Sequence, residues 1–290
     1  MPTGRSGQTL PCRQPRVERV GLRRRWLLAS TAIGIAGCLV LSLPVSATNE
    51  CGVISSNQVI CTSAGNNYTG GITYNPTDDL TMVVQDGVTI TPTSGNEGID
   101  VTFSSSNLFN LDLRLYDSDA ATDITTSGFN AEGIFIGRAH DTTLVNQADI
   151  ASSDDGIEIH AEGAVTINNS GTITSRYSGI YVVGSKSTSI SNSGAIETTG
   201  AGRGIFVRSP VGDVTVDLSE IGTIDTSGSD GDGIYITKLL SVQTWGDVDI
   251  SVAGIIATKG YEADGISLHG IDGHAIIMQP GTGFIKTYGD

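Results

Sequence analysis

The chain has 290 residues, of which 16 are basic, 31 are acidic, 38 are glycine and 6% are aromatic. A formal net charge of −15 disfavours binding to nucleic acid or to an anionic membrane surface. Abundant Val and Ile exclude a disordered composition, and the Gly, Ser, Thr, Asn and Asp between them predict many short strands joined by tight turns.

The first 47 residues predict a helical secretory signal peptide. Seven arginines precede a long apolar run, and small residues at Val45 and Ala47 favour cleavage after Ala47. Two alternatives remain open, because the run is long enough to be a retained membrane anchor and "IAGC" resembles a lipidation signal at Cys38. The long basic region is also compatible with a start codon downstream of Met1.

The rest of the chain is more acidic than the whole. Seven of the 16 basic residues but only one of the 31 acidic residues precede position 48, so the remainder has a formal charge of −21. Cys51 and Cys61 are the only cysteines in this part and bracket nine residues. In an exported chain they predict a local structural disulfide.

A phrase built on Gly-Ile recurs along the chain. Its glycines are Gly98, Gly133, Gly156, Gly179, Gly204, Gly233 and Gly265, at spacings of 35, 23, 23, 25, 29 and 32. A second phrase, "INNSGTI" and then "ISNSGAI", interleaves with the first. This repetition predicts an all-β, right-handed parallel β-helix over residues 48–290 with coils of about 23 residues, whose equivalent strands stack about 4.8 Å apart.

Alternation within the Gly-Ile phrase predicts which side chains fill the bore. Ile157 and Ile159 should be covered by Ile180 and Val182 of the next coil. The glycines should supply either a positive φ or room for a close approach of two backbones.

An asparagine recurs in the second phrase at intervals of 23 residues. Asn146, Asn169 and Asn192 should stack as a hydrogen-bonded amide ladder at a turn. The ladder should end where Glu220 and Val252 take the same place in the phrase.

The phrases "INNSGTITS…SGIYV" and "ISNSGAIETTGAGRGIFV" resemble the passenger domains of bacterial autotransporters, and "TNECGVISSNQVICTSAGNNYTGGITY" resembles the start of such passengers. The resemblance implies a right-handed parallel β-helix exported by a Gram-negative bacterium to its surface. It also implies adhesion or display through contact with a glycan, a host or abiotic surface, or another copy.

A membrane barrel is expected at the C-terminus of an autotransporter, but the chain stops at "FIKTYGD" inside another coil. We therefore expect a C-terminally incomplete passenger, or a free periplasmic β-helix if no barrel follows. A secreted carbohydrate-active enzyme, either a polysaccharide lyase or a glycosidase, is the rival interpretation, and a purely structural segment is a third.

Three columns of side chains should face outward from the Gly-Ile strands. The first precedes each glycine and consists of Glu97, Glu132, Asp155, Ser178, Arg203, Asp232 and Asp264. The column offers two functional interpretations, a Ca²⁺ site or a pair of carboxylates that cleaves a polysaccharide. The candidate residues for either are Glu132, Asp155, Asp232 and Asp264. Ordinary Asp-Gly turn chemistry explains the same pattern, so no metal site and no cofactor are assigned.

The second column lies two residues after each glycine. Its aromatic members, Phe135, Tyr181, Phe206 and Tyr235, are the candidate ligand-binding residues, because a row of exposed rings can bind sugars or a partner. Packing between neighbouring coils explains these rings equally well.

The third column contains His160 beside Glu158, with Asp155 earlier in "SSDDGIEIH". These three residues are the alternative candidates for acid–base catalysis, and a solvated face is the simpler explanation. The chain lacks GxSxG, HExxH, a phosphate-binding loop and zinc spacings. Adhesion is therefore favoured over catalysis.

Overall fold

The computed structural model describes residues 50–104, 109–118, 121–208, 211–237, 246–271, 273–278 and 282–288. The predicted signal peptide, Cys38 and the cleavage site at Ala47 lie outside these residues. Within the described ranges the one helical element is a 3₁₀ turn, η1 (Ser63–Gly65), and no helix is long and apolar enough to cross a membrane.

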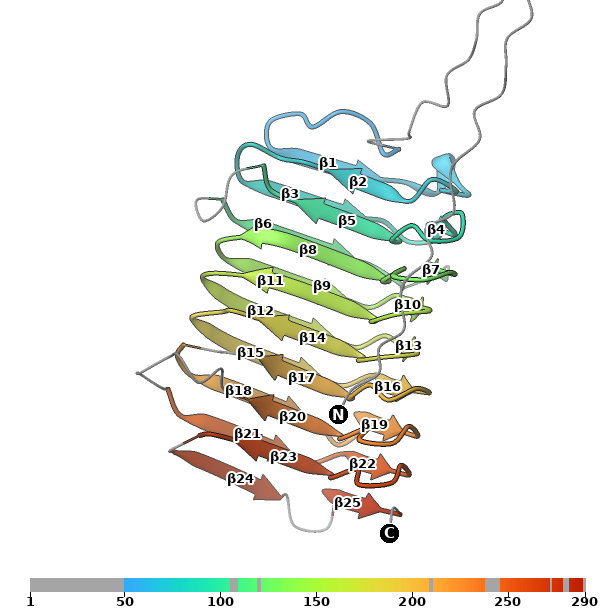
Figure 1. Cartoon of the computed structure of the whole chain (residues 1–290). Coiled ribbons are helices and arrows are strands. Elements are labelled where there is room, and N and C mark those ends of the chain that lie inside the picture. Colours follow the sequence, from blue (N-terminus) through green and yellow to red (C-terminus); the bar gives the residue numbers. More distant parts are fainter. Residues whose placement is uncertain are drawn as a thin grey trace, which may run out of the picture. The chain divides into compact units, whose positions relative to one another are not determined.

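The described strands form a parallel β-solenoid of about eight turns (Figure 1). From β3 onward the chain passes in each turn from sheet A to sheet B and then to sheet C. Equivalent strands of successive turns pair in parallel, so residues far apart in sequence lie directly over one another.

Each complete turn contributes one strand to each sheet, and among the described residues sheet A has nine strands and sheets B and C have eight each. Sheet A consists of β1 (Gln58–Cys61), β3 (Leu80–Val84), β6 (Leu111–Leu115), β9 (Thr142–Asn146), β12 (Ala164–Asn169), β15 (Ser187–Asn192), β18 (Val214–Leu218), β21 (Val248–Val252) and β24 (His274–Met278). Sheet B consists of β4 (Thr89–Ile90), β7 (Asp123–Thr125), β10 (Asp149–Ala151), β13 (Ile173–Ser175), β16 (Ala195–Thr198), β19 (Thr223–Thr226), β22 (Ile255–Thr258) and β25 (Phe284–Thr287). Sheet C consists of β2 (Ile72–Tyr74), β5 (Ile99–Thr102), β8 (Ile134–Ala139), β11 (Ile157–Ala161), β14 (Ile180–Val183), β17 (Ile205–Arg208), β20 (Ile234–Thr237) and β23 (Ile266–His269).

The coils average about 27 residues, so the predicted length of 23 is wrong for the solenoid as a whole. A period of 23 holds in the central coils, where Ile134, Ile157 and Ile180 are partners. The additional residues of other coils enlarge the connections. Seven residues (227–233) join β19 to β20, whereas four (176–179) join β13 to β14.

The core is a stack of branched aliphatic side chains, as the alternation predicts. Ile157 pairs with Ile180 and Ile159 with Val182, and all four are fully buried. Burial of one such side chain stabilises a fold by roughly 1.5–3 kcal/mol. The sequential pairing therefore supplies a similar stabilisation at every coil.

Close packing, and not a positive φ, explains the phrase glycines. A Cβ on Gly179 would lie 2.2 Å from Cγ2 of Ile196 and 2.7 Å from the carbonyl oxygen of Gly204. The other six glycines of the phrase are equally crowded by an isoleucine Cγ2, at 2.2–2.3 Å. A side chain at these positions would push successive coils apart.

The first coil is closed by a disulfide between Cys51 and Cys61. The Tyr74 hydroxyl donates a hydrogen bond to the carbonyl oxygen of Gly52 at 2.7 Å. This contact ties the disulfide loop to sheet C.

The asparagine ladder forms as predicted. Nδ2 of Asn146 donates to Oδ1 of Asn169 at 2.8 Å, and Nδ2 of Asn169 donates to Oδ1 of Asn192 at 2.7 Å. The ladder ends after Asn192, as predicted, but the next residue in the column is Leu218 and not Glu220. Val252 takes the following place as predicted, since it pairs with Leu218. The connection after β18 has four residues where the connection after β15 has two, which moves Glu220 past the stacking position.

Replacement of Asn169 by Ala should lower the free energy of unfolding by about 3 kcal/mol, because it removes one hydrogen bond from each of the buried amides of Asn146 and Asn192. Urea unfolding followed by circular dichroism measures this change. Asn168→Ala is the matched control, since Asn168 is the adjacent residue and is exposed. Equal losses in the two variants would contradict a stabilising role of the ladder.

Candidate functional site

A hollow of about 360 Å³ opens on the solenoid surface where four connections between sheets B and C lie side by side. Aromatic residues in its lining are Phe129, Tyr177, Tyr181 and Phe206. The remaining lining residues are Asn130, Asp154, Asp155, Ser178, Ala201, Gly202 and Arg203. The hollow thus combines rings with carboxyl groups.

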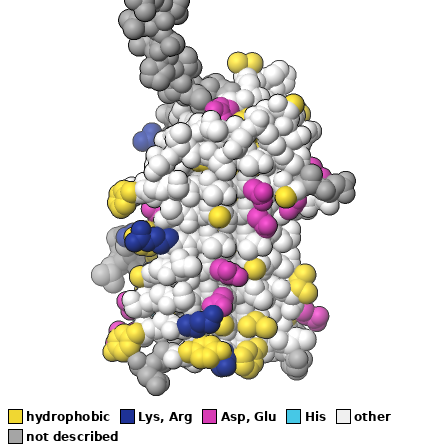
Figure 2. Space-filling view, turned by 90° about the vertical axis from the view of Figure 1, so that its right-hand side faces the viewer, with side chains coloured by type: hydrophobic (Ala, Val, Ile, Leu, Met, Phe, Trp, Pro, Cys, Tyr) yellow, Lys and Arg dark blue, Asp and Glu magenta, His cyan; other side chains and the backbone are white. Residues whose placement is uncertain are grey.

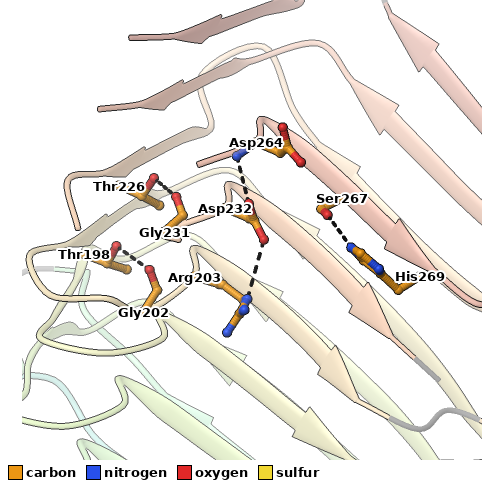
Figure 3. Close-up of polar contacts among 9 residues, drawn as sticks. All are labelled: Thr198, Gly202, Arg203, Thr226, Gly231, Asp232, Asp264, Ser267 and His269. Atoms are coloured by element: carbon orange, nitrogen blue, oxygen red, sulfur yellow. Dashed lines mark hydrogen bonds and ion pairs between the residues drawn. The ribbon is translucent and has the colours of Figure 1, made fainter. Parts of the chain in front are cut away.

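Hydroxyl groups near the ends of the sheet-B strands hold these connections in place. Each hydroxyl donates a hydrogen bond to a carbonyl oxygen two to five residues further along the chain. The pairs are Thr126 with Ala131 (2.6 Å), Ser152 with Asp154 (3.1 Å), Ser175 with Tyr177 (3.1 Å) and Thr198 with Gly202 (3.3 Å). Figure 3 shows the contact at Thr198 and the equivalent contact at Thr226 in the next coil.

Two of the three aspartates before the phrase glycines, Asp155 and Asp232, are buried, contrary to the predicted outward column, whereas Asp264 is exposed as predicted. Asp155 is 8% exposed and its Oδ1 accepts a hydrogen bond from the backbone N–H of Ser178 at 2.5 Å. Asp232 is similarly buried, accepts from the N–H of Asp264 at 2.8 Å and lies 3.6 Å from Nε of Arg203 (Figure 3). The carboxylates therefore supply acceptors for N–H groups of the following coil.

Burial makes two carboxyl groups near the hollow unusually weak acids. Loss of solvent raises the pKa of Asp155 to about 7, and the negative charges of Glu158 and Asp154 add to the effect while hydrogen bonds from Ser178 oppose it. Burial likewise raises the pKa of Glu132 to about 7. Near neutral pH these groups can both accept and donate hydrogen bonds.

The predicted aromatic column forms a continuous stack, termed the ring ladder. Its members in order are Phe135, His160, Tyr181, Phe206, Tyr235 and His269, with neighbouring centroids 4.7–6.4 Å apart. Tyr181 and Phe206 stack face to face at 4.7 Å and 15°. Much of the ring surface in this ladder is therefore used for packing between coils.

The structure divides the predicted site residues between two places. Asp155 lines the hollow, and so do Tyr181 and Phe206, which also belong to the ring ladder. Phe135 and Tyr235 belong to the ring ladder and do not line the hollow.

Glu158 and His160 lie on β11 beside the hollow but not in its lining, since Glu158 is the strand partner of the lining residue Tyr181. Nε2 of His160 is 2.5 Å from Oε1 of Glu158, and the two side chains are 46% and 15% exposed. The imidazole of His160 is itself a member of the ring ladder, between Phe135 and Tyr181. The three candidate catalytic residues are thus not gathered at one point of the hollow.

The alternative metal ligands occur as carboxylates of successive coils, with Glu132 before Asp155 and Asp232 before Asp264. Among the residues that the structure describes, no group of three or more His, Cys, Asp or Glu side chains is arranged to hold a metal ion.

Phe129 and Tyr177 were not among the predicted binding residues. Phe129 is 81% exposed and Tyr177 is 37% exposed, and both lie in connections outside the repeated phrases. The sequence does carry a signal for them, which is an aromatic residue within the turn-like segments "SGFNAEG" and "SRYSG". Connections run over the protein surface, so an aromatic ring in one of them is seldom buried.

The fold and the hollow together define a parallel β-solenoid with an aromatic and acidic surface site. No family model matches the chain, and no curated protein or solved structure matches it significantly. The hollow is therefore the feature from which a function is inferred.

Asp155→Asn should weaken the pH dependence of stability. Because the pKa of Asp155 is higher in the folded chain than its ordinary value of 3.8, the folded state binds the proton more tightly, and the free energy of unfolding falls as pH rises from about 4 to about 7. Thermal unfolding between pH 4.5 and pH 8 should show a shallower decline in the variant, with Glu132 responsible for part of what remains.

The matched control is Asp149→Asn. Asp149 is exposed, and it also accepts a backbone hydrogen bond, from the N–H of Thr172 at 3.0 Å. In Asp149→Asn, stability should depend on pH as steeply as in the unmodified protein. If stability in Asp155→Asn also depends on pH that steeply, Asp155 does not cause the pH dependence.

Proposed function

We propose that this protein is an exported cell-surface protein, the N-terminal passenger part of an autotransporter, and that it acts in adhesion or display by binding glycan at the hollow. The signal-like N-terminus, the repeated phrases and the parallel solenoid support this proposal. The solenoid is right-handed in this proposal, in keeping with the usual hand of crossover connections between parallel strands.

The observation that carries the proposal is the juxtaposition of exposed rings with one buried and one half-buried carboxyl group. Phe129 and Tyr177 offer apolar surface beside Asp154 and Asp155 in a hollow of about 360 Å³. Sugar rings present apolar C–H faces and polar hydroxyl edges, so this combination suits them. The volume lies within the range of roughly 300–1,000 Å³ that is usual for small-ligand sites.

The exposed acidic and apolar side chains of the solenoid also support binding to other molecules or surfaces. Figure 2 looks onto the side that carries the sheet-B strands, where acidic side chains are spread along the solenoid and apolar ones gather toward the C-terminal end. Exposed members of that end include Ile255, Tyr261 and Phe284. A host surface, an abiotic surface or another copy are the other partners of this adhesin.

A secreted carbohydrate-active enzyme is the second candidate function. It is favoured by one observation, the pKa of about 7 for Asp155 in the hollow, which suits a general acid. The position of Glu158 and His160 outside the lining weighs against it.

Replacement of Tyr177 by Ala should weaken glycan binding about tenfold, because it removes ring surface from the hollow. Binding of the purified protein to an immobilised panel of defined oligosaccharides identifies ligands, and titration calorimetry gives the affinities. Tyr116→Ala is the matched control, since Tyr116 has the same exposure of 37% and does not line the hollow.

Two outcomes would contradict the adhesin. If Tyr177→Ala and Tyr116→Ala bind glycan equally strongly, the hollow is not the binding site. If the protein binds no member of the panel, glycan is not its partner. Release of new reducing ends from a bound oligosaccharide, abolished by Asp155→Asn, would establish the enzyme instead.

Fractionation of source cells tests the cellular location. An antibody against residues 50–290 should detect a protein much larger than 30.1 kDa in the outer-membrane fraction, because a passenger is joined to its barrel. A band of 30 kDa or less in the periplasm or medium would contradict the autotransporter, and a cytoplasmic band would contradict export.

A further inference from the structure

Four acidic groups lie in or near the lining of the hollow. Asp154 and Asp155 line it, and the charge of Glu158 is near enough to contribute to the raised pKa of Asp155. Glu132 lies in the same cluster, since the charges of Glu158 and Asp154 also raise its pKa. The four carboxyl groups come from two successive coils.

Basic groups near the hollow compensate little of this charge. Arg203 is the single basic residue among the described lining residues, and its Nε lies 3.6 Å from Oδ2 of Asp232. Its guanidinium carbon also lies 4.9 Å and 4.1 Å from the ring centroids of Phe206 and Tyr235. The charge of Arg203 is therefore already matched by a carboxylate and two rings.

A second arginine, Arg176, stands beside the Tyr177 ring, with its guanidinium carbon 5.6 Å from the ring centroid. Arg176 is exposed, so solvent screens much of its charge, and the remainder opposes the rise in the pKa of Asp154. The hollow thus keeps an excess of negative charge.

The buried carboxyl group of Asp155 offers directional hydrogen bonding to a ligand. It is more than nine-tenths buried and lines the hollow, and a backbone N–H holds its Oδ1 in place. A carboxyl group has about four lone-pair positions, so it can accept further hydrogen bonds from ligand hydroxyls. Asn130 adds a side-chain amide, which both donates and accepts.

We infer that the hollow binds an uncharged sugar ring, with hydroxyl groups on Asp154 and Asp155 and its apolar face on Tyr177, and that it discriminates against sugars with acidic groups. This inference rests on the proposed function, because it names the glycan class that the same hollow takes. Uronates, sialates and sulfated sugars bring a negative charge to carboxylates that are poorly compensated. The lyase form of the enzyme hypothesis is disfavoured for the same reason, since its substrate is a uronate.

Matched oligosaccharides that differ only in charge test the inference. Galacto-oligosaccharides, gluco-oligosaccharides and the uronate oligomers of equal length and linkage are titrated into the full chain at pH 8. The uncharged member of at least one pair should bind about tenfold more tightly than its uronate. Asp155→Asn should reduce that ratio severalfold, and Asp149→Asn should leave it unchanged.

The outcomes separate the inference from the proposed function. Uronates that bind as tightly as their uncharged partners, with binding lost in Tyr177→Ala, would overturn the inference and retain a glycan-binding hollow. No binding by either class would overturn both. If neither Asp155→Asn nor Asp154→Asn changes the ratio of affinities for uncharged and uronate oligosaccharides, these carboxyl groups do not set the preference.

Discussion

The close contact between each phrase glycine and an isoleucine of the next coil is the constraint on which the rest of the solenoid depends. Because no Cβ fits between Gly179 and Ile196, the turn from sheet B to sheet C passes at a fixed height above its neighbour. The residue before the glycine is thereby fixed as well. At three successive coils that residue is Asp155, Ser178 or Arg203, and all three line the hollow.

Aromatic residues divide into two sets with different physical roles. In the ring ladder, rings such as Tyr181 and Phe206 cover one another, so their surface stabilises the stacking of coils. In the connections, Phe129 and Tyr177 remain exposed to solvent. A rigid sheet thus supports a small number of rings that are available to a ligand, which reduces the entropy lost on binding.

The repeating part of the fold could be predicted from sequence because its physics is periodic. Ile157, Ile180 and the asparagines recur wherever the next coil needs the same contact, and the spacing alone places them. The spacings show which coils are longer but not where their additional residues lie, and two added residues after β18 were enough to put Leu218 where Glu220 was expected.

The site was harder to predict, because burial of Asp155 depends on neighbouring connections and Phe129 belongs to no repeated phrase. The alternation of residues along a strand indicates which face of the sheet a side chain occupies, but not which connections cover that side chain. Only the coordinates of several coils together show that Asp155 is enclosed and that Phe129 is not.

The contact between glycine and isoleucine also makes one coil a transferable unit of genetic change. An in-frame duplication of 23 residues from the central coils would insert a complete layer, lengthen the rod by about 4.8 Å and leave every existing contact type intact. A duplication that shifted one strand by a single residue would instead turn its isoleucines to solvent. Such a gene can therefore change the reach of its product readily while its cross-section stays constant.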